Sequence, residues 1–113
     1  IQKAEIYHGA FAISVCPSEG LESPTVVGAQ AANELLNIIG IKASFVLTEY
    51  NDKIYISSRS IDEINVQIIM EKLGGGGHLN VAGAQLEGVT IVQAKRMIQD
   101  TLDEMLKEGD IEE

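Results

Sequence analysis

The chain has 113 residues, which leaves room for one hydrophobic core, so a single domain is expected over residues 1–113. Hydrophobic residues make up 45% of the chain and aromatic residues 4%, which excludes a disordered protein and predicts an aliphatic core. The net charge of −9, without a basic stripe that could displace counterions from a phosphate backbone, argues against a long nucleic-acid duplex as ligand.

The first third of the chain predicts a strand, a loop and a helix. A first strand is expected over 4–15, because Phe11, Ile13 and Val15 alternate with the small Ala12 and Ser14. A polar loop follows, and Ser23 as the N-cap with Pro24 at the first helical position starts a helix. That helix is expected to end at Gly40. Its buried stripe is expected to consist of Val27, Ala31, Leu35 and either Ile38 or Ile39.

A hairpin is predicted in the middle of the chain. Residues 42–50 and 53–59 have strand character, and Asn51-Asp52 between them is typical of a tight turn. In the second strand Ile54 and Ile56 should face one side of the sheet. The opposite side should carry Tyr55, Ser57 and Arg59.

Two further helices are predicted from capping boxes. Ser60-x-x-Glu63 should start the first of them, with an apolar stripe of Ile64, Ile68, Ile69 and Leu73. A short strand over 83–87 follows. Thr90-x-x-Gln93 should start the last helix, which is expected to bury Ile91, Ala94, Ile98, Leu102 and Met105.

The resulting order is β-α-β-β-α-β-α. It predicts an α+β fold, a small mixed β-sheet with helices packed on it, in which the first crossover should be right-handed. Seven acidic residues and one Lys lie from Asp100 onward, while residues 1–99 carry ten acids and seven Lys or Arg. Most of the negative charge is therefore expected on the last helix and an acidic tail over 108–113, which leaves room for a local anion site elsewhere.

The first residue, the single cysteine and the hydropathy bear on the kind of protein and the cellular compartment. The chain opens at Ile1 without a Met, so we expect a domain of a longer protein. The single Cys16 cannot form an internal disulfide, fits a reducing compartment and is interpreted as a packing residue rather than a nucleophile. No apolar run reaches the roughly 18 residues of a membrane span.

Four consecutive glycines, Gly74 to Gly77, followed by His78 form the most distinctive segment. One glycine suffices to end a helix, and each further one costs about 0.5–1 kcal/mol relative to Ala. Either the run curls into a nest of N–H groups around an anion, or it is a turn that allows tight packing. His78 can donate to a phosphate oxygen. As a metal ligand it is weak, because His8 is the only other histidine and no ligand cluster has metal-binding spacing.

Arg59 is the second candidate for anion binding. It lies at a strand end before a predicted helix N-terminus, with Ser57 and Tyr55 on the same face, so a guanidinium and a hydroxyl could meet one phosphate. The alternative is a solvated Arg59 paired with Asp62 or Glu63. A helix of about 12 residues, roughly 18 Å long, should separate Arg59 from the glycine run. The two sites then serve an extended ligand, or one of them is structural.

These segments resemble a known family. Ile54–Ser60 (Ile-Tyr-Ile-Ser-Ser-Arg-Ser), Ile64–Leu73, the run from Gly74 to His78 and, more weakly, Gly40–Phe45 resemble the DHH-associated C-terminal domain of DHH/DHHA phosphoesterases. Within that family the match is most like the GdpP (YybT) type of cyclic-di-AMP phosphodiesterase, and it extends to about residue 107. Many members have Ala-Ala-Gly where this chain has Val81-Ala82-Gly83.

The resemblance implies a substrate-binding role. Gly75, Gly76, Gly77 and His78 would line the cleft and hold phosphate or nucleotide, Arg59 would bind phosphate, and Ser57 and Asn65 are weaker candidates. The implied ligand is a cyclic dinucleotide or a short oligonucleotide. The implied setting is the cytoplasmic side of a membrane-anchored bacterial parent, without direct membrane contact by this domain; a homodimer is left open.

The catalytic centre of the family lies in the preceding DHH domain, which holds two manganese ions. Neither Asp-His-His nor Asp-x-Asp occurs in this chain. No catalytic or metal-binding residue is therefore expected here, and the domain should be inactive without its DHH partner domain. Three alternatives stay open: an oligonucleotide or single-strand exonuclease of the RecJ or nanoRNase kind, a non-catalytic nucleotide-binding or assembly module, and a domain appended to a tRNA synthetase.

Overall fold

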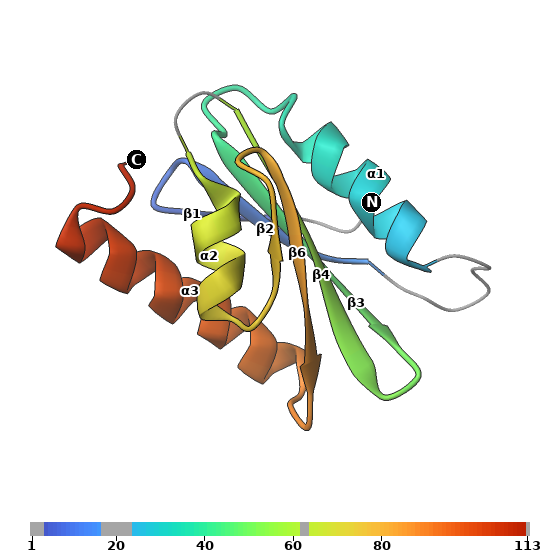
Figure 1. Ribbon diagram of the computed structural model, residues 1–113. Helices are drawn as coiled ribbons and strands as arrows, with labels where there is room; N and C mark the ends of the chain where they lie inside the picture. The colour runs from blue at the N-terminus through green and yellow to red at the C-terminus, as the bar shows by residue number, and fades with distance from the viewer. Residues whose placement is uncertain (1–3, 17–23, 62–63, 113) are drawn as a thin grey trace.

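The computed structural model describes residues 4–16, 24–61 and 64–112. Within these ranges three helices and six strands follow one another (Figure 1). Their bounds are β1 Glu5–Tyr7, β2 Phe11–Cys16, α1 Pro24–Leu35, β3 Ala43–Tyr50, β4 Lys53–Ser60, α2 Val66–Lys72, β5 Gly76–Gly77, β6 Val81–Glu87 and α3 Ile91–Glu108.

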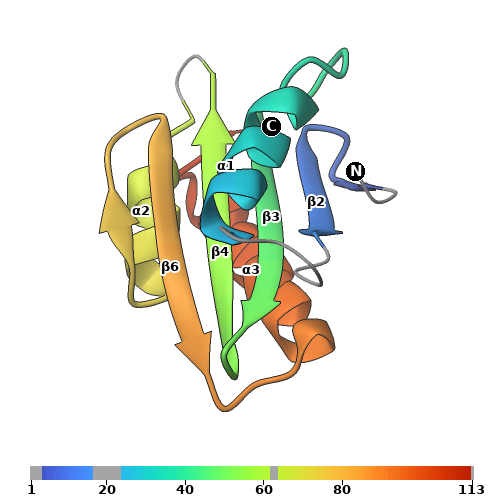
Figure 2. The same ribbon diagram turned by 90° about the vertical axis from the view of Figure 1, so that its right-hand side faces the viewer.

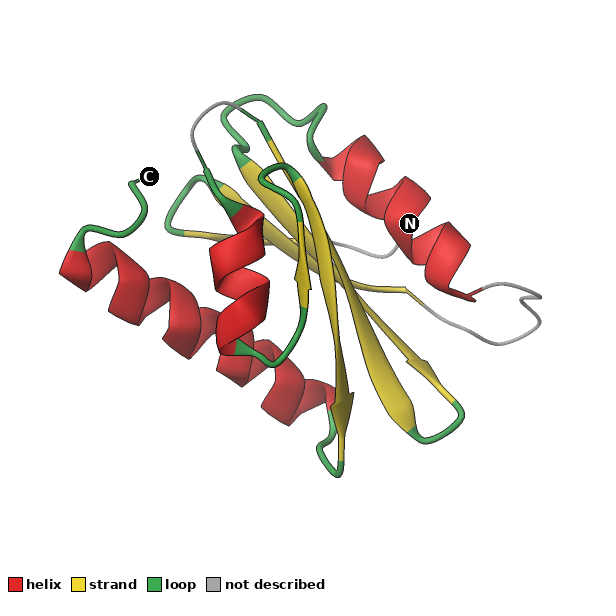
Figure 3. Ribbon diagram, viewed as in Figure 1, coloured by secondary structure: helices red, strands yellow, loops and turns green. Residues whose placement is uncertain are grey.

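One mixed sheet forms the centre of the molecule. The strand order is β1-β2-β3-β4-β6-β5, in which β2 and β3 are parallel and every other pair is antiparallel. Helix α1 covers one face, and α2 and α3 cover the other (Figures 1 and 3). The predicted α+β class is confirmed, with two short edge strands, β1 and β5, added to the predicted order.

Both faces of the sheet are apolar, but to different extents. A large cluster lies between the sheet and α2 and α3, and includes Phe11, Phe45 and Met105. A smaller one under α1 consists of three alanines with Leu35, Ile41 and Val46. Helix α1 packs on β2, β3 and β4. The α1 side of β6 and β5 is therefore left without a helix over it (Figure 2).

The turn between β3 and β4 confirms the predicted hairpin. Tyr50 pairs with Lys53, so Asn51 and Asp52 form a two-residue loop. Their φ angles are 52° and 62°, which is the left-handed geometry of a type I′ turn, and Asn and Asp tolerate it. Because this turn sets the register, alternate residues of β4 are buried and half-buried along its whole length.

The expected single strand over 4–15 is wrong. His8 and Gly9 adopt φ angles of 53° and 72°, so the chain reverses there and β1 pairs antiparallel with β2. Periodicity could not separate the two strands, because β1 has only three residues and only a short turn lies between them. The predicted strand over 83–87 is present but begins two residues earlier, at Val81.

Helix α1 begins at Pro24 as predicted, whereas Ser23 lies outside the described residues. The helix ends at Leu35 rather than near Gly40, and Ile38 and Ile39 are 42% and 100% exposed. The predicted extension of the buried stripe to these two isoleucines is wrong, since the chain has already left the helix when it reaches them.

The capping box predicted at Ser60 is also wrong, whereas the one at Thr90 is confirmed. Ser60 is the last residue of β4, and α2 is capped by Asn65, whose side-chain oxygen accepts from Gln67 N at 3.0 Å and from Ile68 N at 3.3 Å. In α3 the Thr90 hydroxyl accepts from Gln93 N, and the Gln93 side chain accepts from Thr90 N. Ile91 is half-buried, and the rest of the predicted stripe is buried.

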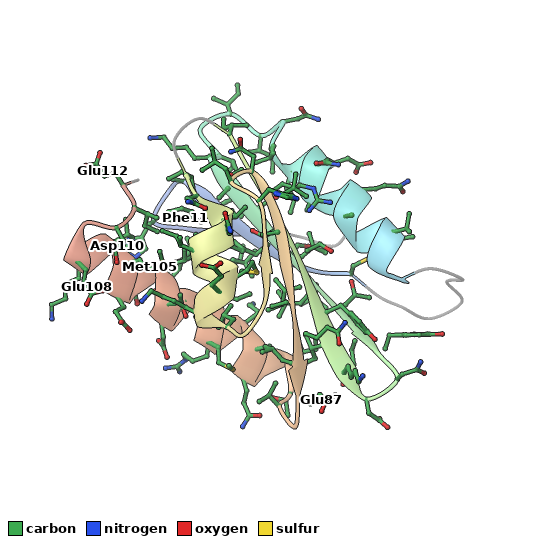
Figure 4. All side chains as sticks on the ribbon, in the orientation of Figure 1. Phe11, Glu87, Met105, Glu108, Asp110 and Glu112 are labelled. Carbon is green, nitrogen blue, oxygen red and sulfur yellow. The ribbon has the colours of Figure 1, made fainter. Side chains whose placement is uncertain are left out.

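The last residues turn back after α3. Gly109 ends the helix in the left-handed conformation, and Ile111 is buried against the larger cluster. Glu108, Asp110 and Glu112 lie together at this end of the molecule (Figure 4). The acidic end thus belongs to the helix that covers the face opposite α1. No helix in the described ranges combines the length and apolar character that a membrane span requires.

Candidate functional site

Most of the predicted site residues meet on the α1 side of the sheet, over β4, β6 and β5, where α1 packs on β4 but leaves β6 and β5 uncovered (Figure 2). Ser57 of β4 pairs with Gly83 of β6, which pairs with Gly76 of β5. One row further, Arg59 pairs with Val81, and the amide of His78 donates to the Val81 carbonyl at 2.7 Å. Directly paired residues lie on the same face of a sheet, so these two rows form one surface.

This pairing resolves the distance expected between Arg59 and His78. Helix α2 has seven residues rather than about 12, and β6 returns beside β4. Only one strand separates the backbones of Arg59 and His78, which places them about 10 Å apart. A single phosphate-bearing ligand can reach both, so neither an extended ligand nor a purely structural role for one of the two sites has to be assumed.

Arg59 is half-buried at the end of β4. Its Nη1 donates to the carbonyl of Ser58 at 2.8 Å, which restrains the guanidinium. The other N–H groups of the guanidinium remain available to a ligand. Burial lowers the pKa of the guanidinium, which nevertheless stays charged at neutral pH. The predicted alternative partners Asp62 and Glu63 lie outside the described residues.

The four glycines do three different things. Gly74 ends α2 with a φ of 87°, and the amide of Gly75 then donates to the Met70 carbonyl at 2.8 Å. A Cβ on Gly75 would lie 2.1 Å from the Gly83 carbonyl oxygen. A Cβ on Gly77, whose φ is 147°, would lie 2.5 Å from Ala82 Cα. Gly76, in contrast, has no heavy atom within 4 Å of a Cβ position.

The run is thus a helix terminator followed by an edge strand. Gly74, Gly75 and Gly77 are required by backbone geometry and by close approach to β6, whereas packing gives no reason for Gly76. In an antiparallel ladder, hydrogen-bonded and non-hydrogen-bonded pairs alternate. His78 is hydrogen-bonded to Val81, so the neighbouring pair of Gly77 and Ala82 is not hydrogen-bonded, and the N–H and C=O of Gly77 point away from β6. The glycines offer an outward amide at the sheet edge.

Beside these rows lies an open hollow of about 590 Å³. Tyr55 and Ser57 border it from β4, Gly83 and Gln85 from β6, and Gly75 from the segment before β5. Ser57, a weaker candidate from sequence, therefore lies between Arg59 and this hollow. Asn65 is instead engaged as the cap of α2, with its side-chain oxygen shared between two backbone amides.

Sequence reasoning missed the contacts that hold the His78 turn in place. Asn80 Nδ2 donates to Ser60 Oγ at 2.8 Å, and Ser60 Oγ donates to the Ile64 carbonyl at 2.6 Å. Ser60 N also donates to the Asn80 carbonyl at 3.1 Å. The end of β4, which carries Arg59, is thereby tied to the turn after His78. No local pattern could have paired residues twenty positions apart.

A second missed cluster lies on the other side of the sheet. The Tyr7 hydroxyl donates to Asp103 at 2.8 Å, and His8 Nε2 lies 2.7 Å from Asp103 Oδ1. The hydrogen bonds from His8 and then from Tyr7 lower the pKa of Asp103, and the bond to Asp103 together with burial raises the pKa of Tyr7. These contacts dock the β1–β2 turn on α3.

The donor set for metal ions is poor. Among the described residues no three His, Cys, Asp or Glu side chains gather into a group that could hold a metal ion. His78 is exposed, and its sequence neighbours are Gly77 and Leu79, which are not metal ligands. The groups that this site presents are therefore the Arg59 guanidinium, the His78 imidazole and backbone amides.

The family model that matches this chain is the DHHA1 domain, over residues 10–108. The chain belongs to the DHHA1 domain family. The domain includes both rows of the candidate site, from Ser57 to Gly83. The resemblance inferred from the glycine run and the Arg59 segment is confirmed.

Two curated relatives agree with this assignment, and one solved structure shares the fold. The chain is 48% identical over 104 residues to "Cyclic-di-AMP phosphodiesterase PdeA" of Listeria monocytogenes, covering 91% of this chain and 16% of the relative. It is 37% identical over 110 residues to "Cyclic-di-AMP phosphodiesterase GdpP" of Geobacillus thermodenitrificans, covering 96% of this chain and 17% of the relative.

The solved structure is an exopolyphosphatase-related protein from Bacteroides fragilis, with a TM-score of 0.75 and 22% identity, covering 90% of this chain and 31% of that one. At this identity the similarity shows the fold alone. The chain spans about a sixth of the length of the two phosphodiesterases, at 16% and 17%.

Proposed function

We propose that this DHHA1 domain binds the substrate of a cyclic-di-AMP phosphodiesterase, which opens the ring to linear pApA. The observation that carries the proposal is that Arg59, the outward amide of Gly77 and His78 meet over β4, β6 and β5, beside the part of the sheet that α1 leaves uncovered. A guanidinium and a backbone amide carried by strands whose backbones lie about 10 Å apart suit a ligand that carries phosphate. The names of both relatives supply the nucleotide.

Hydrolysis is assigned to another part of the parent protein. The described residues gather no metal-ligand cluster, whereas a two-metal centre needs several carboxylates and histidines. The preceding DHH domain would hold manganese and cleave, while this domain orients the phosphate and excludes water. We further propose that the parent is anchored in the cell membrane with this domain on the cytoplasmic side, which fractionation of cells expressing the parent would test.

The first test is an amide-resolved NMR titration of this chain with cyclic-di-AMP and with pApA, using inorganic phosphate as the control. Saturable shifts at Gly76, Gly77, His78 and Arg59 with both nucleotides, at lower concentration than with phosphate, are expected. Equal responses to nucleotide and phosphate would reduce the site to simple anion binding. The absence of any chemical-shift change at these amides would contradict the proposed binding of substrate by this domain.

A short RNA in the same titration addresses the exonuclease alternative. A domain that serves a cyclic dinucleotide phosphodiesterase should bind cyclic-di-AMP more tightly than a dinucleotide RNA of mixed sequence. The reverse order would favour an oligonucleotide substrate of the RecJ or nanoRNase kind. The acidic charge of α3 lies across the sheet from this face and does not decide between the two.

A further inference from the structure

The hollow beside Arg59 is uncharged. Its described lining residues include neither Asp, Glu, Lys nor Arg, although charged residues make up 22% of the chain. It begins at the Ser57–Gly83 pair, which lies two residues from Arg59 along β4, and continues to the Tyr55–Gln85 pair. A cationic site and a neutral hollow thus follow one another on the same sheet face, as a phosphate and a neutral group of one ligand would require.

The floor of the hollow is backbone. Gly83 has no side chain, and Gly75 approaches β6 so closely that a Cβ would lie 2.7 Å from Ala84 Cα. The side chains on this sheet face come from the rim, where Tyr55 and Gln85 are directly paired and Ser57 stands beside Gly83. A flat floor with an aromatic ring at its rim fits a planar ligand group better than a branched one.

The rim carries polar atoms that are free to bind. Among the residues that the structure describes, no hydrogen bond engages the Tyr55 hydroxyl, the Ser57 hydroxyl or the Gln85 amide. Tyr55 and Ser57 are half-buried and Gln85 is exposed, so their polar groups are available to hydrogen-bond a ligand.

We infer that this hollow is the nucleobase subsite and that Tyr55 and Gln85 select adenine. The inference rests on the proposed function, because it assumes that the phosphate lies at Arg59 and His78. A tyrosine ring stacks on any base. The Gln85 amide provides one donor and one acceptor, which match N7 and the 6-amino group of adenine. Guanine presents two acceptors at the same edge and calls for Arg or Lys, which the hollow does not contain.

The test compares four ligands on the same chain by NMR: inorganic phosphate, ribose 5-phosphate, AMP and GMP. AMP should bind about tenfold more tightly than ribose 5-phosphate through base stacking. It should bind about tenfold more tightly than GMP through the Gln85 contact. Only the nucleotides should shift the amides of Tyr55, Gly83 and Gln85. Inorganic phosphate and ribose 5-phosphate, which carry no base, should shift only the amides of Arg59 and His78.

Variants then separate base reading from phosphate binding. Gln85→Ala should remove the preference for AMP over GMP without changing the affinity for ribose 5-phosphate, and Gln85→Arg should reverse the preference. Tyr55→Leu should weaken both nucleotides alike. Gln99→Ala is the matched control, because it removes the same amide from α3 on the opposite face, where Gln99 donates to Glu5.

The outcomes distinguish the subsite from the proposed function. Equal affinity for AMP, GMP and ribose 5-phosphate, with shifts confined to Arg59 and His78, would overturn the subsite and leave the phosphate grip standing. An unaltered AMP preference in Gln85→Ala would overturn the role of Gln85. No response to any phosphate ligand would overturn the proposed function and the subsite with it.

Discussion

Replacing Gly75 and Gly76 by alanine, one at a time, tests the division of the glycine run into structural and accessible positions. The two residues are adjacent and chemically identical. A Cβ on Gly75 would lie 2.1 Å from the Gly83 oxygen and 2.7 Å from Ala84 Cα, and both atoms belong to the backbone. A Cβ on Gly76 would meet no heavy atom within 4 Å.

The magnitudes follow from these contacts. Backbone atoms cannot rotate aside, so Gly75→Ala must move the segment before β5 away from β6, and overpacking of this kind costs about 1–3 kcal/mol. Gly76→Ala introduces no clash and restricts the unfolded chain, which stabilises by about 0.4–1 kcal/mol. The two free energies of unfolding should therefore differ by roughly 1.4–4 kcal/mol, or about 6–16 °C in Tm at this size.

Urea denaturation followed by circular dichroism measures both variants against the parent chain. Equal destabilisation of the two would refute the reasoning, since it would mean that the β5–β6 contact does not distinguish the positions. Nucleotide titration of the same samples adds a second readout. Gly76→Ala should bind cyclic-di-AMP about tenfold more weakly while remaining folded, because its methyl group enters the space assigned to the ligand.

Three further predictions concern single side chains. Ser58 is fully buried, and its hydroxyl has no hydrogen-bond partner among the described residues, so Ser58→Ala should stabilise the fold by about 1 kcal/mol in urea denaturation. Ser60→Ala, two residues along the same strand face, removes several hydrogen bonds and should destabilise it by about 2 kcal/mol; the same sign for both would contradict the assignment. The lowered pKa of Asp103 contributes stability that is present above the unfolded pKa near 4 and is lost as the pH falls through the folded pKa. The urea midpoint of Asp103→Asn should therefore fall less between pH 6 and pH 3 than that of the parent chain. An equal fall in both proteins would count against this role of Asp103. Arg59→Ala should weaken nucleotide binding roughly tenfold to hundredfold in the NMR titration, whereas Lys53→Ala, which removes the same charge from the far end of β4, should have little effect; equal losses would indicate nonspecific attraction.

Features that depend on neighbours a few residues apart were predictable from the sequence. The Asn51-Asp52 turn, the Thr90 cap and the buried stripe of α3 each rest on side chains and backbone within one or two turns of the chain. The alternation of β4 likewise placed Ser57 and Arg59 on one face. The family followed from the same short segments, because its distinguishing residues are contiguous.

What required the tertiary structure was every relation that crosses β6. The nearness of Arg59 and His78, the conversion of the glycine run into an edge strand and the tie between Ser60 and Asn80 all depend on β6 returning beside β4. Local preference also misjudged Ser60, whose hydroxyl bonds across the fold rather than capping a helix. Strand pairing between distant segments is fixed by burial of the whole sheet, so a site built on it becomes visible only once the sheet has formed.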